Sequence, residues 1–133
     1  MKTLLLIFSL LLITTNAYAE WTFYFTSVDG DVFFYDKSSV KRNGNKVKVW
    51  SYINISPNNE EAKSDNIYSQ RGLDEIDCVN ETSKRLSWQS FTKPNLQGDM
   101  RDISNPNPNP NLPIDYIVPD STQAELMKLV CKK

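Results

Sequence analysis

The sequence predicts a small α+β domain, in which one C-terminal α-helix packs on a β-sheet and is tied to it by a single disulfide. Three observations predict this fold. Most of the chain alternates apolar and polar residues with period two, which is typical of strands. The last fifteen residues instead carry the signals of a helix. The chain has two cysteines, Cys78 in strand-like sequence and Cys131 at the end of the helical segment.

The first 19 residues have the pattern of a secretory signal peptide. Lys2 supplies the positive start, residues 4–13 are an apolar run, and residues 17–19 (Ala-Tyr-Ala) form a small-x-small cleavage site. The alternative is an uncleaved membrane anchor, but the apolar run is short for a membrane span. We therefore expect cleavage between Ala19 and Glu20 and export to the periplasm, the cell surface or the medium. No cysteine follows the apolar run, so a bacterial-type lipid anchor has no attachment point.

Removing 19 of the 133 residues leaves 114, which is one small domain spanning residues 20–133. A domain of this size gains much from one crosslink, because it buries only about two-thirds of its unfolded surface. In an oxidising compartment Cys78 and Cys131 have only each other as partners, the alternative being two free thiols. Closing the loop of 53 positions between them contributes about 4 kcal/mol in the chain-entropy model.

The first part of the mature chain predicts a series of strands. In residues 21–27, Trp21, Phe23 and Phe25 alternate with the more polar Thr22, Tyr24 and Thr26. Residues 31–35 begin a second strand after the turn at Asp29-Gly30-Asp31. Residues 36–40 are polar and are expected to form a strand end or a short irregular link. Asn43-Gly44 is the strongest hairpin signal in the chain, because both residues tolerate the positive φ of a type I′ turn.

Residues 46–56 form the clearest strand. Val47 and Val49 lie on an aliphatic face that also holds Ile53 and is expected to be core. Trp50 and Tyr52 take the opposite face. We expect them to be covered by another element, with the C-terminal helix as a candidate, since tryptophan is seldom fully exposed. The alternative is an exposed aromatic patch of the kind that binding surfaces use.

The remaining segments before the helix are shorter or less regular. The sequence predicts surface loops, strands and turns in this order: a loop over residues 57–66, a strand over 67–79 with an irregularity at Arg71-Gly72, a turn over 80–83, a strand over 84–91, a low-complexity loop over 94–113, and a short strand over 115–118. The loop over 94–113 contains the alternating Asn-Pro run of residues 105–111, which cannot join a ladder because proline lacks the N–H donor.

The C-terminal segment is predicted to be a helix that begins after Pro119. Thr122 and Glu125 have the spacing of a capping box, in which hydroxyl and carboxylate each satisfy an orphan backbone N–H. Leu126, Leu129 and Val130 follow at helical spacing and form one apolar stripe, so the helix needs a surface to pack on. That surface is expected to be the sheet.

Composition argues against several classes of function. The chain has no histidine, the expected disulfide removes both thiolates, and no glycine-rich phosphate loop is present. The mature chain has 14 basic and 16 acidic residues, which does not suggest nucleic-acid binding. We expect no catalysis, cofactor or metal; the remaining enzymatic alternative is a hydrolase that uses Asp74, Glu75 and Asp77. The Asp29-Gly30-Asp31 segment is explained by a turn and lacks the further ligands of a calcium loop.

One local cluster of charge is a candidate contact for a protein partner. It comprises Lys41, Arg42, Lys46 and Lys48 around the predicted hairpin. The alternative is a solvated hairpin end with no partner. Trp50 and Tyr52 would extend the same surface if they are exposed.

Several short segments occur together in an order that is familiar from one family. They are Trp21, residues 36–40 (Asp-Lys-Ser-Ser-Val), residues 47–50 (Val-Lys-Val-Trp), Ser69, Asp77-Cys78, residues 84–86 (Lys-Arg-Leu), residues 119–121 (Pro-Asp-Ser), Leu126 and Cys131. This order resembles the bacterial surface-adhesin protein E-like domain over residues 20–132.

The resemblance implies an antiparallel sheet of about six strands with a C-terminal helix tied by the cysteine pair. It also implies binding of host extracellular-matrix or serum proteins, such as laminin and vitronectin, in some cases by a homodimer. The founding adhesins are lipid-anchored, whereas this chain lacks the anchoring cysteine. We therefore hypothesise an exported, non-enzymatic binding module. The alternative is a periplasmic accessory protein that binds a bacterial partner or small ligand and has no adhesin role.

Overall fold

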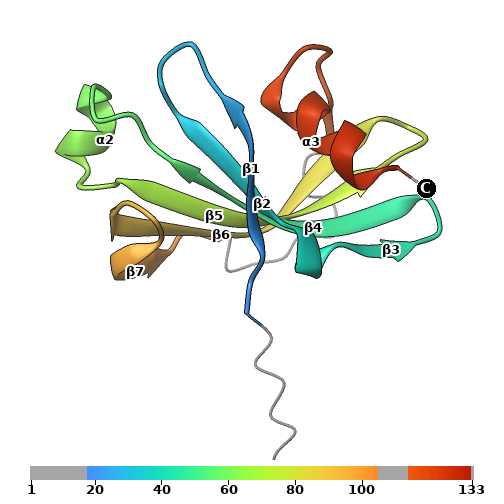
Figure 1. Cartoon of the computed structure of the whole chain (residues 1–133), viewed down its shortest axis with the longest axis horizontal. Coiled ribbons are helices and arrows are strands. Elements are labelled where there is room, and N and C mark those ends of the chain that lie inside the picture. Colours follow the sequence, from blue (N-terminus) through green and yellow to red (C-terminus); the bar gives the residue numbers. More distant parts are fainter. Residues whose placement is uncertain (1–17, 105–113, 133) are drawn as a thin grey trace, which may run out of the picture.

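The computed structural model describes residues 18–104 and 114–132 (Figure 1). Nearly all of the predicted signal peptide and the whole Asn-Pro run lie outside the described residues. The elements follow in the order β1 (Trp21–Thr26), β2 (Val32–Asp36), the 3₁₀ helix η2 (Lys37–Ser39), β3 (Lys41–Asn43), β4 (Lys46–Asn54), α2 (Glu60–Ser64), β5 (Ser69–Asp77), β6 (Thr82–Lys93), β7 (Gln97–Asp102), β8 (Asp115–Tyr116) and α3 (Thr122–Val130).

All strand pairs are antiparallel, and the main path of the sheet is β1-β2-β4-β5-β6-β7. The predicted antiparallel sheet is confirmed, although β7 on this path falls in a segment that was predicted to be a loop. The short strands β3 and β8 add to it by pairing with β4 and β6, so the described part of the chain has eight strands. The helices α2 and α3 lie over opposite ends of one face of the sheet (Figure 1). We call this the helix face and the other side the open face.

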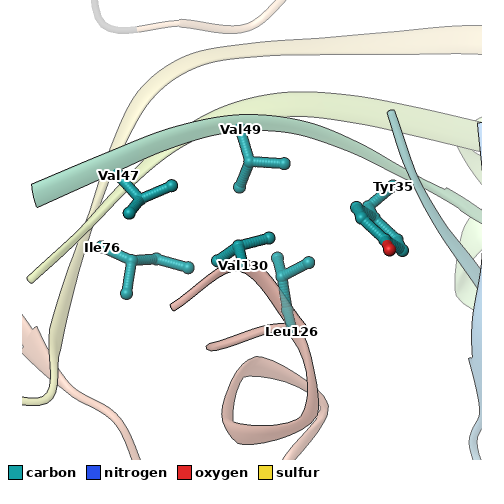
Figure 2. Close-up of a cluster of buried hydrophobic side chains, with 6 residues drawn as sticks. All are labelled: Tyr35, Val47, Val49, Ile76, Leu126 and Val130. Carbon is teal, nitrogen blue, oxygen red and sulfur yellow. The ribbon is translucent and has the colours of Figure 1, made fainter. Parts of the chain in front are cut away.

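The hydrophobic core lies between α3 and the helix face. Val47, Val49 and Ile76 from the sheet meet Leu126 and Val130 from the helix, and Figure 2 shows the valines of β4 pointing toward these two side chains. Four of the five are fully buried, and Val130 is 5% exposed. Burying each such side chain contributes about 1.5–3 kcal/mol. Val47 and Val49 of the predicted aliphatic face are therefore confirmed as core, whereas Ile53 on the same face is only partly buried.

The predicted disulfide is confirmed. The sulfur atoms of Cys78 and Cys131 are 2.04 Å apart, and their Cα atoms are 5.7 Å apart. Cys78 directly follows β5 and Cys131 directly follows α3, so the bond fixes the end of the helix at one end of the sheet. Arg42 of β3 adds to this attachment by donating hydrogen bonds to the backbone carbonyls of Val130 and Lys132, at 3.3 and 3.4 Å. A cation at these carbonyls complements the negative end of the helix dipole.

The predicted capping box at the start of α3 is wrong by one residue. Ser121, in an extended conformation, is the N-cap, and its hydroxyl accepts a hydrogen bond from the backbone N–H of Ala124 at 3.1 Å. Thr122 is already helical, and Glu125 forms an ion pair with Lys128 instead of returning to the helix start. Two hydroxyl residues in succession made the cap ambiguous, since both are good N-caps.

The hairpin at Asn43-Gly44 is confirmed, but its turn differs from the predicted type I′. Asn43 pairs with Lys46, so Gly44 and Asn45 are the two central residues. Gly44 has a φ of 60°, whereas Asn45 is not among the residues with positive φ. Positive φ at the first central residue alone is the pattern of a type II′ turn.

Two predicted loops contain regular structure. Residues 57–66 include α2, whose N-cap Asn59 accepts a hydrogen bond from the Ala62 N–H. Residues 94–113 include β7, which is exposed along its length and pairs with β6. Both segments have little apolar surface to bury, so the period-two and helical patterns that predict buried elements are missing from them. The polar link at residues 36–40 forms η2, which Asp36 caps.

The irregularity expected at Arg71-Gly72 lies instead on the neighbouring strand. β5 pairs continuously with β4 from Ser69 to Asp77. In the β5–β6 pairing, Leu73 pairs with Ser87 but Asp74 pairs with Arg85, so one extra residue is accommodated in β6. Such a bulge changes which side chains of a strand share a face.

Candidate functional site

The open face carries a row of side chains that crosses the sheet at right angles to its strands. Its members are direct cross-strand neighbours in the register, one from each strand of the main path: Phe23, Phe34, Tyr52, Arg71, Gln89 and Asp102. Cross-strand neighbours on one face are close enough to interact directly. We call these six residues the cross-strand row.

The aromatic end of the row is held together by ring contacts. The rings of Phe34 and Tyr52 are stacked, with centroids 4.6 Å apart and an interplanar angle of 10°. Trp21 meets Tyr52 edge-on at 4.8 Å, and Phe23 lies 6.1 Å from Phe34. Tyr52 is only 8% exposed, whereas Phe23 at the sheet edge is 55% exposed. The row therefore passes from a packed centre to an exposed aromatic edge.

Tyr52 is covered, as expected, but the C-terminal helix that was the candidate cover for Trp50 and Tyr52 does not lie over them. The helix lies on the opposite face, because its apolar stripe packs on Val47 and Val49. Tyr52 is buried by aromatic side chains of β1 and β2 instead. Trp50 is half-buried on the open face, beside the row.

Arg71 joins the aromatic part of the row to its polar part. Its guanidinium carbon lies 5.5 Å from the centre of the Trp50 ring and 5.4 Å from that of Phe91. Its Nε donates a hydrogen bond to the Gln89 side chain. A planar guanidinium can stack on aromatic rings and still donate in its own plane, which an ammonium cannot do. Arg71 therefore has a defined position on a half-exposed surface.

The lysines predicted to contact a partner lie at one corner of the open face. Lys41 pairs across strands with Lys48, Lys48 with Glu75, and Glu75 with Lys84, so all four side chains share this face. Lys46 lies beside them, with its ammonium 3.7 Å from the Glu75 carboxylate, and that of Lys48 is 3.9 Å away. We call Lys41, Lys46, Lys48 and Lys84 the lysine corner.

The lysine corner has a net positive charge. Its four lysines face two carboxylates, Glu75 and Asp77. The side chains of Lys46 and Lys48 are 58% and 53% exposed, and such exposed ion pairs contribute little to stability. Hydrogen bonds from Asn80 lower the pKa of the Asp77 carboxyl, which keeps it ionised within its turn. A cavity of about 410 Å³ at the corner is lined by Lys46, Glu75, Asp77, Asn80, Thr82, Ser83, Lys84, Ile114 and Tyr116.

Arg42 does not belong to this surface. It pairs across strands with Val47, on the helix face, and its guanidinium is hydrogen-bonded to the end of α3. The predicted contact set therefore divides in the structure: Arg42 attaches the helix, and the other five residues lie on the open face.

The three acids of the alternative hydrolase hypothesis do not form a common site. Asp74 is on the helix face and is paired with Arg85, whereas Glu75 and Asp77 are on the open face. Alternation along β5 separates them. Within residues 18–104 and 114–132, no group of three or more acidic, cysteine or histidine side chains is arranged to hold a metal ion. No helix in this part of the chain is long and apolar enough to cross a membrane.

Sequence reasoning singled out Tyr52 but missed the other members of the cross-strand row, and missed Lys84 of the lysine corner, because these residues come from strands distant in the chain. Arg71, Phe34 and Lys84 each look unremarkable in their own segments. Only the pairing register places them beside Tyr52, Phe91 and Glu75. Aligning the strands in register would have revealed the row, but the register is not readable from a single strand.

Comparisons with known proteins agree on one relationship. The family model described as surface-adhesin protein E matches residues 21–132. The crystal form II structure of Haemophilus influenzae protein E is similar, with a TM-score of 0.60 and 13% sequence identity, covering 88% of this chain and 91% of that chain. A second structure of Haemophilus influenzae protein E gives a TM-score of 0.58 at 14% identity, covering 88% and 87% of the two chains. No curated protein matches this chain.

At these identities the solved structures support the fold, while the family model supports the relationship over the whole domain. The antiparallel sheet, the C-terminal helix and the Cys78–Cys131 disulfide agree with that assignment. This chain belongs to the surface-adhesin protein E family.

Proposed function

We propose that this protein is an exported, non-enzymatic binding module that contacts another protein through its open face. The contact would be made by the lysine corner and the aromatic residues next to it. The observation that carries the proposal is the position of these groups: exposed lysines and a fixed arginine lie beside aromatic rings on the face away from the helices. Membership of an adhesin family supports a binding role.

The chemistry of this face favours a partner with an acidic surface. Lysines that are more than half exposed speed association with an acidic surface. Aromatic and arginine side chains are the residues that most often dominate binding energy once they are buried by a partner. On this face Trp50 and Arg71 are partly exposed and Phe23 is exposed, so all three can be contacted by a partner. We propose a host extracellular-matrix or serum protein as the partner.

The test compares two triple variants of the chain starting at Glu20. One is Lys41→Gln, Lys46→Gln and Lys48→Gln in the lysine corner. The matched control is Lys37→Gln, Lys63→Gln and Lys132→Gln, which removes three exposed lysines elsewhere. Both lower the net charge by the same amount. Binding to immobilised laminin and vitronectin is measured at low and high salt.

We expect the corner variant to bind at least about tenfold more weakly at low salt, with a reduced salt dependence, and the control to bind like the wild type. Equal binding by the two variants would contradict the role of the corner. Binding only to a protein from the bacterial envelope would contradict the host partner and favour a periplasmic accessory role. Cell fractionation distinguishes the two locations independently.

A further inference from the structure

A second, chemically different site lies on the helix face, between α2 and α3. It is centred on Arg85, whose Nε and Nη2 donate to the two carboxylate oxygens of Asp74. The Asp74 side chain is 4% exposed and that of Arg85 is 42% exposed. A buried carboxylate therefore holds one edge of a guanidinium whose other end reaches solvent.

The bulge in β6 creates this arrangement. Arg85 pairs with Asp74 and Trp88 pairs with Gly72, so Arg85 and Trp88 share the helix face although they are three residues apart. In a regular strand, residues three apart point to opposite faces. The guanidinium of Arg85 lies 5.8 Å from the centre of the Trp88 ring, and Trp88 is 38% exposed.

Glycine at position 72 leaves the space that the guanidinium occupies. A Cβ atom built on Gly72 would be 2.6 Å from Cζ of Arg85, closer than real Cβ contacts come. Arg85 therefore lies directly over the backbone of β5. It is fixed from below by Gly72, from one edge by Asp74, and at its side by Trp88. An arginine held in this way loses little side-chain entropy when it binds a ligand.

A cavity of about 230 Å³ opens at this arginine. Its walls are mixed, with apolar groups from Phe33, Ile53 and Trp88 and uncharged polar groups from Ser51, Gln70, Thr122 and Gln123. Among the described residues that line it, Arg85 carries the only formal charge. Tyr24 also lines the cavity, and its phenol stays neutral because burial, and then the nearby Asp74 charge, raise its pKa.

The guanidinium retains hydrogen-bonding capacity toward this space. Of its five N–H groups, two are used by Asp74, and no other acceptor for them is found among residues 18–104 and 114–132. Three N–H groups remain, two on Nη1 and one on Nη2, and the Nη2 group with one of the Nη1 groups forms a second fork at the end of the side chain. That fork matches the two oxygens of a carboxylate.

We propose that this cavity binds a carboxylate carried on a small apolar group, with the carboxylate on the free fork of Arg85 and the apolar group against Trp88, Phe33 and Ile53. An Asp74–Arg85 pair with a purely structural role would not require the bulge that brings Trp88 to the same face, the glycine beneath the guanidinium or the adjoining cavity. Because Asp74 offsets the charge of Arg85, affinity depends on directed hydrogen bonds and falls in the millimolar range. The same chemistry is offered by a free apolar acid and by the C-terminus of a peptide.

The test uses the chain from Glu20 labelled with ¹⁵N, and follows the Trp88 indole N–H and the Arg85 Nε–H by NMR. The probes are N-acetylphenylalanine and its neutral amide, which differ only in the carboxylate. We expect the acid to shift both signals and to bind at least about tenfold more tightly than the amide. Equal binding by the two probes, or no shift of either signal at tens of millimolar acid, would overturn the proposal.

Two paired variants distinguish the site from a general surface effect. Asp74→Asn with Arg85→Gln removes the ion pair at constant net charge, and should abolish the preference for the acid. Glu125→Gln with Lys128→Gln removes another ion pair, whose residues do not line the cavity at Arg85, and should retain that preference. If the first pair destabilises the fold, Trp88→Ala provides a second variant, in which acid binding should weaken while the preference over the amide remains. The proposal would also be overturned if the double variant at Asp74 and Arg85 and the variant Trp88→Ala both bound N-acetylphenylalanine as tightly as the wild type.

A longer probe identifies the source of the carboxylate. N-acetyl-Gly-Gly-Phe can extend into the neighbouring cavity of about 420 Å³, which shares Arg85, Trp88 and Gln123 with the first. Tighter binding of this peptide than of N-acetylphenylalanine would assign the site to a peptide C-terminus. Weaker binding would assign it to a small free acid. The cavity at Arg85 lies on the opposite face from the lysine corner and shares no lining residue with the cavity there, so binding of N-acetylphenylalanine is independent of partner binding at the corner.

Discussion

The two faces of the sheet are stabilised in different ways. On the helix face, Val47, Val49 and Ile76 are completely buried by a helix that lies far away in the chain. On the open face, Phe34, Tyr52 and Arg71 contact each other sideways, from neighbouring strands. The first arrangement removes apolar surface from solvent. The second leaves the upper surface of the row partly available for contact.

This difference shows why a partly exposed aromatic and basic face can coexist with a small core. Strand β4 contributes to both faces, because alternate side chains point to opposite sides. The valines of β4 are buried by the helix, and the end of the helix is attached to the sheet by the disulfide and by Arg42. The aromatic and basic side chains of the same strand are positioned by the pairing of neighbouring strands alone. Loss of the helix attachment and loss of a row residue should therefore have effects of different size.

The largest effect is expected from removing the disulfide. Replacing both cysteines (Cys78→Ala with Cys131→Ala) should lower the free energy of unfolding by about 4 kcal/mol, because the bond closes a loop with a sequence separation of 53. Urea unfolding of the variant and the wild type measures this difference. Reduction of the wild type should reproduce it. A loss below about 1 kcal/mol would mean that Arg42 and the core hold α3 without the bond.

The next comparison truncates one side chain to alanine on each face of the sheet. Leu126→Ala, at a fully buried position, should cost about 3 kcal/mol, since it leaves a cavity under the helix. Phe34→Ala should cost only about 1–2 kcal/mol although it removes a larger side chain, because Phe34 is half-buried. Chemical denaturation of both variants tests the ranking. A greater loss for Phe34→Ala would show that the cross-strand row is part of the main core.

The accuracy of the sequence-based predictions also differs between the helix face and the open face. Local patterns were enough to place Val47 and Val49 in the core and to position the hairpin at Gly44. The expectation of export and the cysteine count were enough to predict the disulfide, since no other pairing was available. An antiparallel sheet with a C-terminal helix was also predicted correctly, although β7 lies in a predicted loop and the order of the strands was not predicted.

The rest depended on relations between strands that are not visible in one segment. The cover of Tyr52 comes from Trp21 and Phe34, which only the register brings beside it. The bulge in β6 arises from a mismatch with β5, so the common face of Arg85 and Trp88 could not be read from β6 alone. The lysine corner was partly predictable because Lys41, Lys46 and Lys48 are close in sequence, whereas Lys84 joins them through β5.

A pH experiment probes the helix face through Tyr24. Burial, followed by the charge of Asp74, raises the pKa of its phenol above the ordinary value of 10.0. Above about pH 10 the unfolded chain releases this proton while the folded chain keeps it, so stability should fall as pH rises, by at most about 1.4 kcal/mol per pH unit. Tyr24→Phe should remove this part of the slope. The exposed Tyr116→Phe is the matched control, and an equal change in both variants would contradict the assignment to Tyr24.

The smallest effect is expected from Arg71→Lys on the open face, which keeps the charge but removes the planar guanidinium. The variant should lose the stacking on Trp50 and Phe91 and the directed bond to Gln89, at a cost of about 1 kcal/mol in unfolding free energy. Near-ultraviolet circular dichroism should also change, because Trp50 loses its fixed neighbour. Lys48→Arg, a charge-conserving change at the corner, should alter neither signal. If Arg71→Lys leaves both the unfolding free energy and the circular dichroism unchanged, as the control does, the stacking of Arg71 has no role in ordering the open face and only its charge matters.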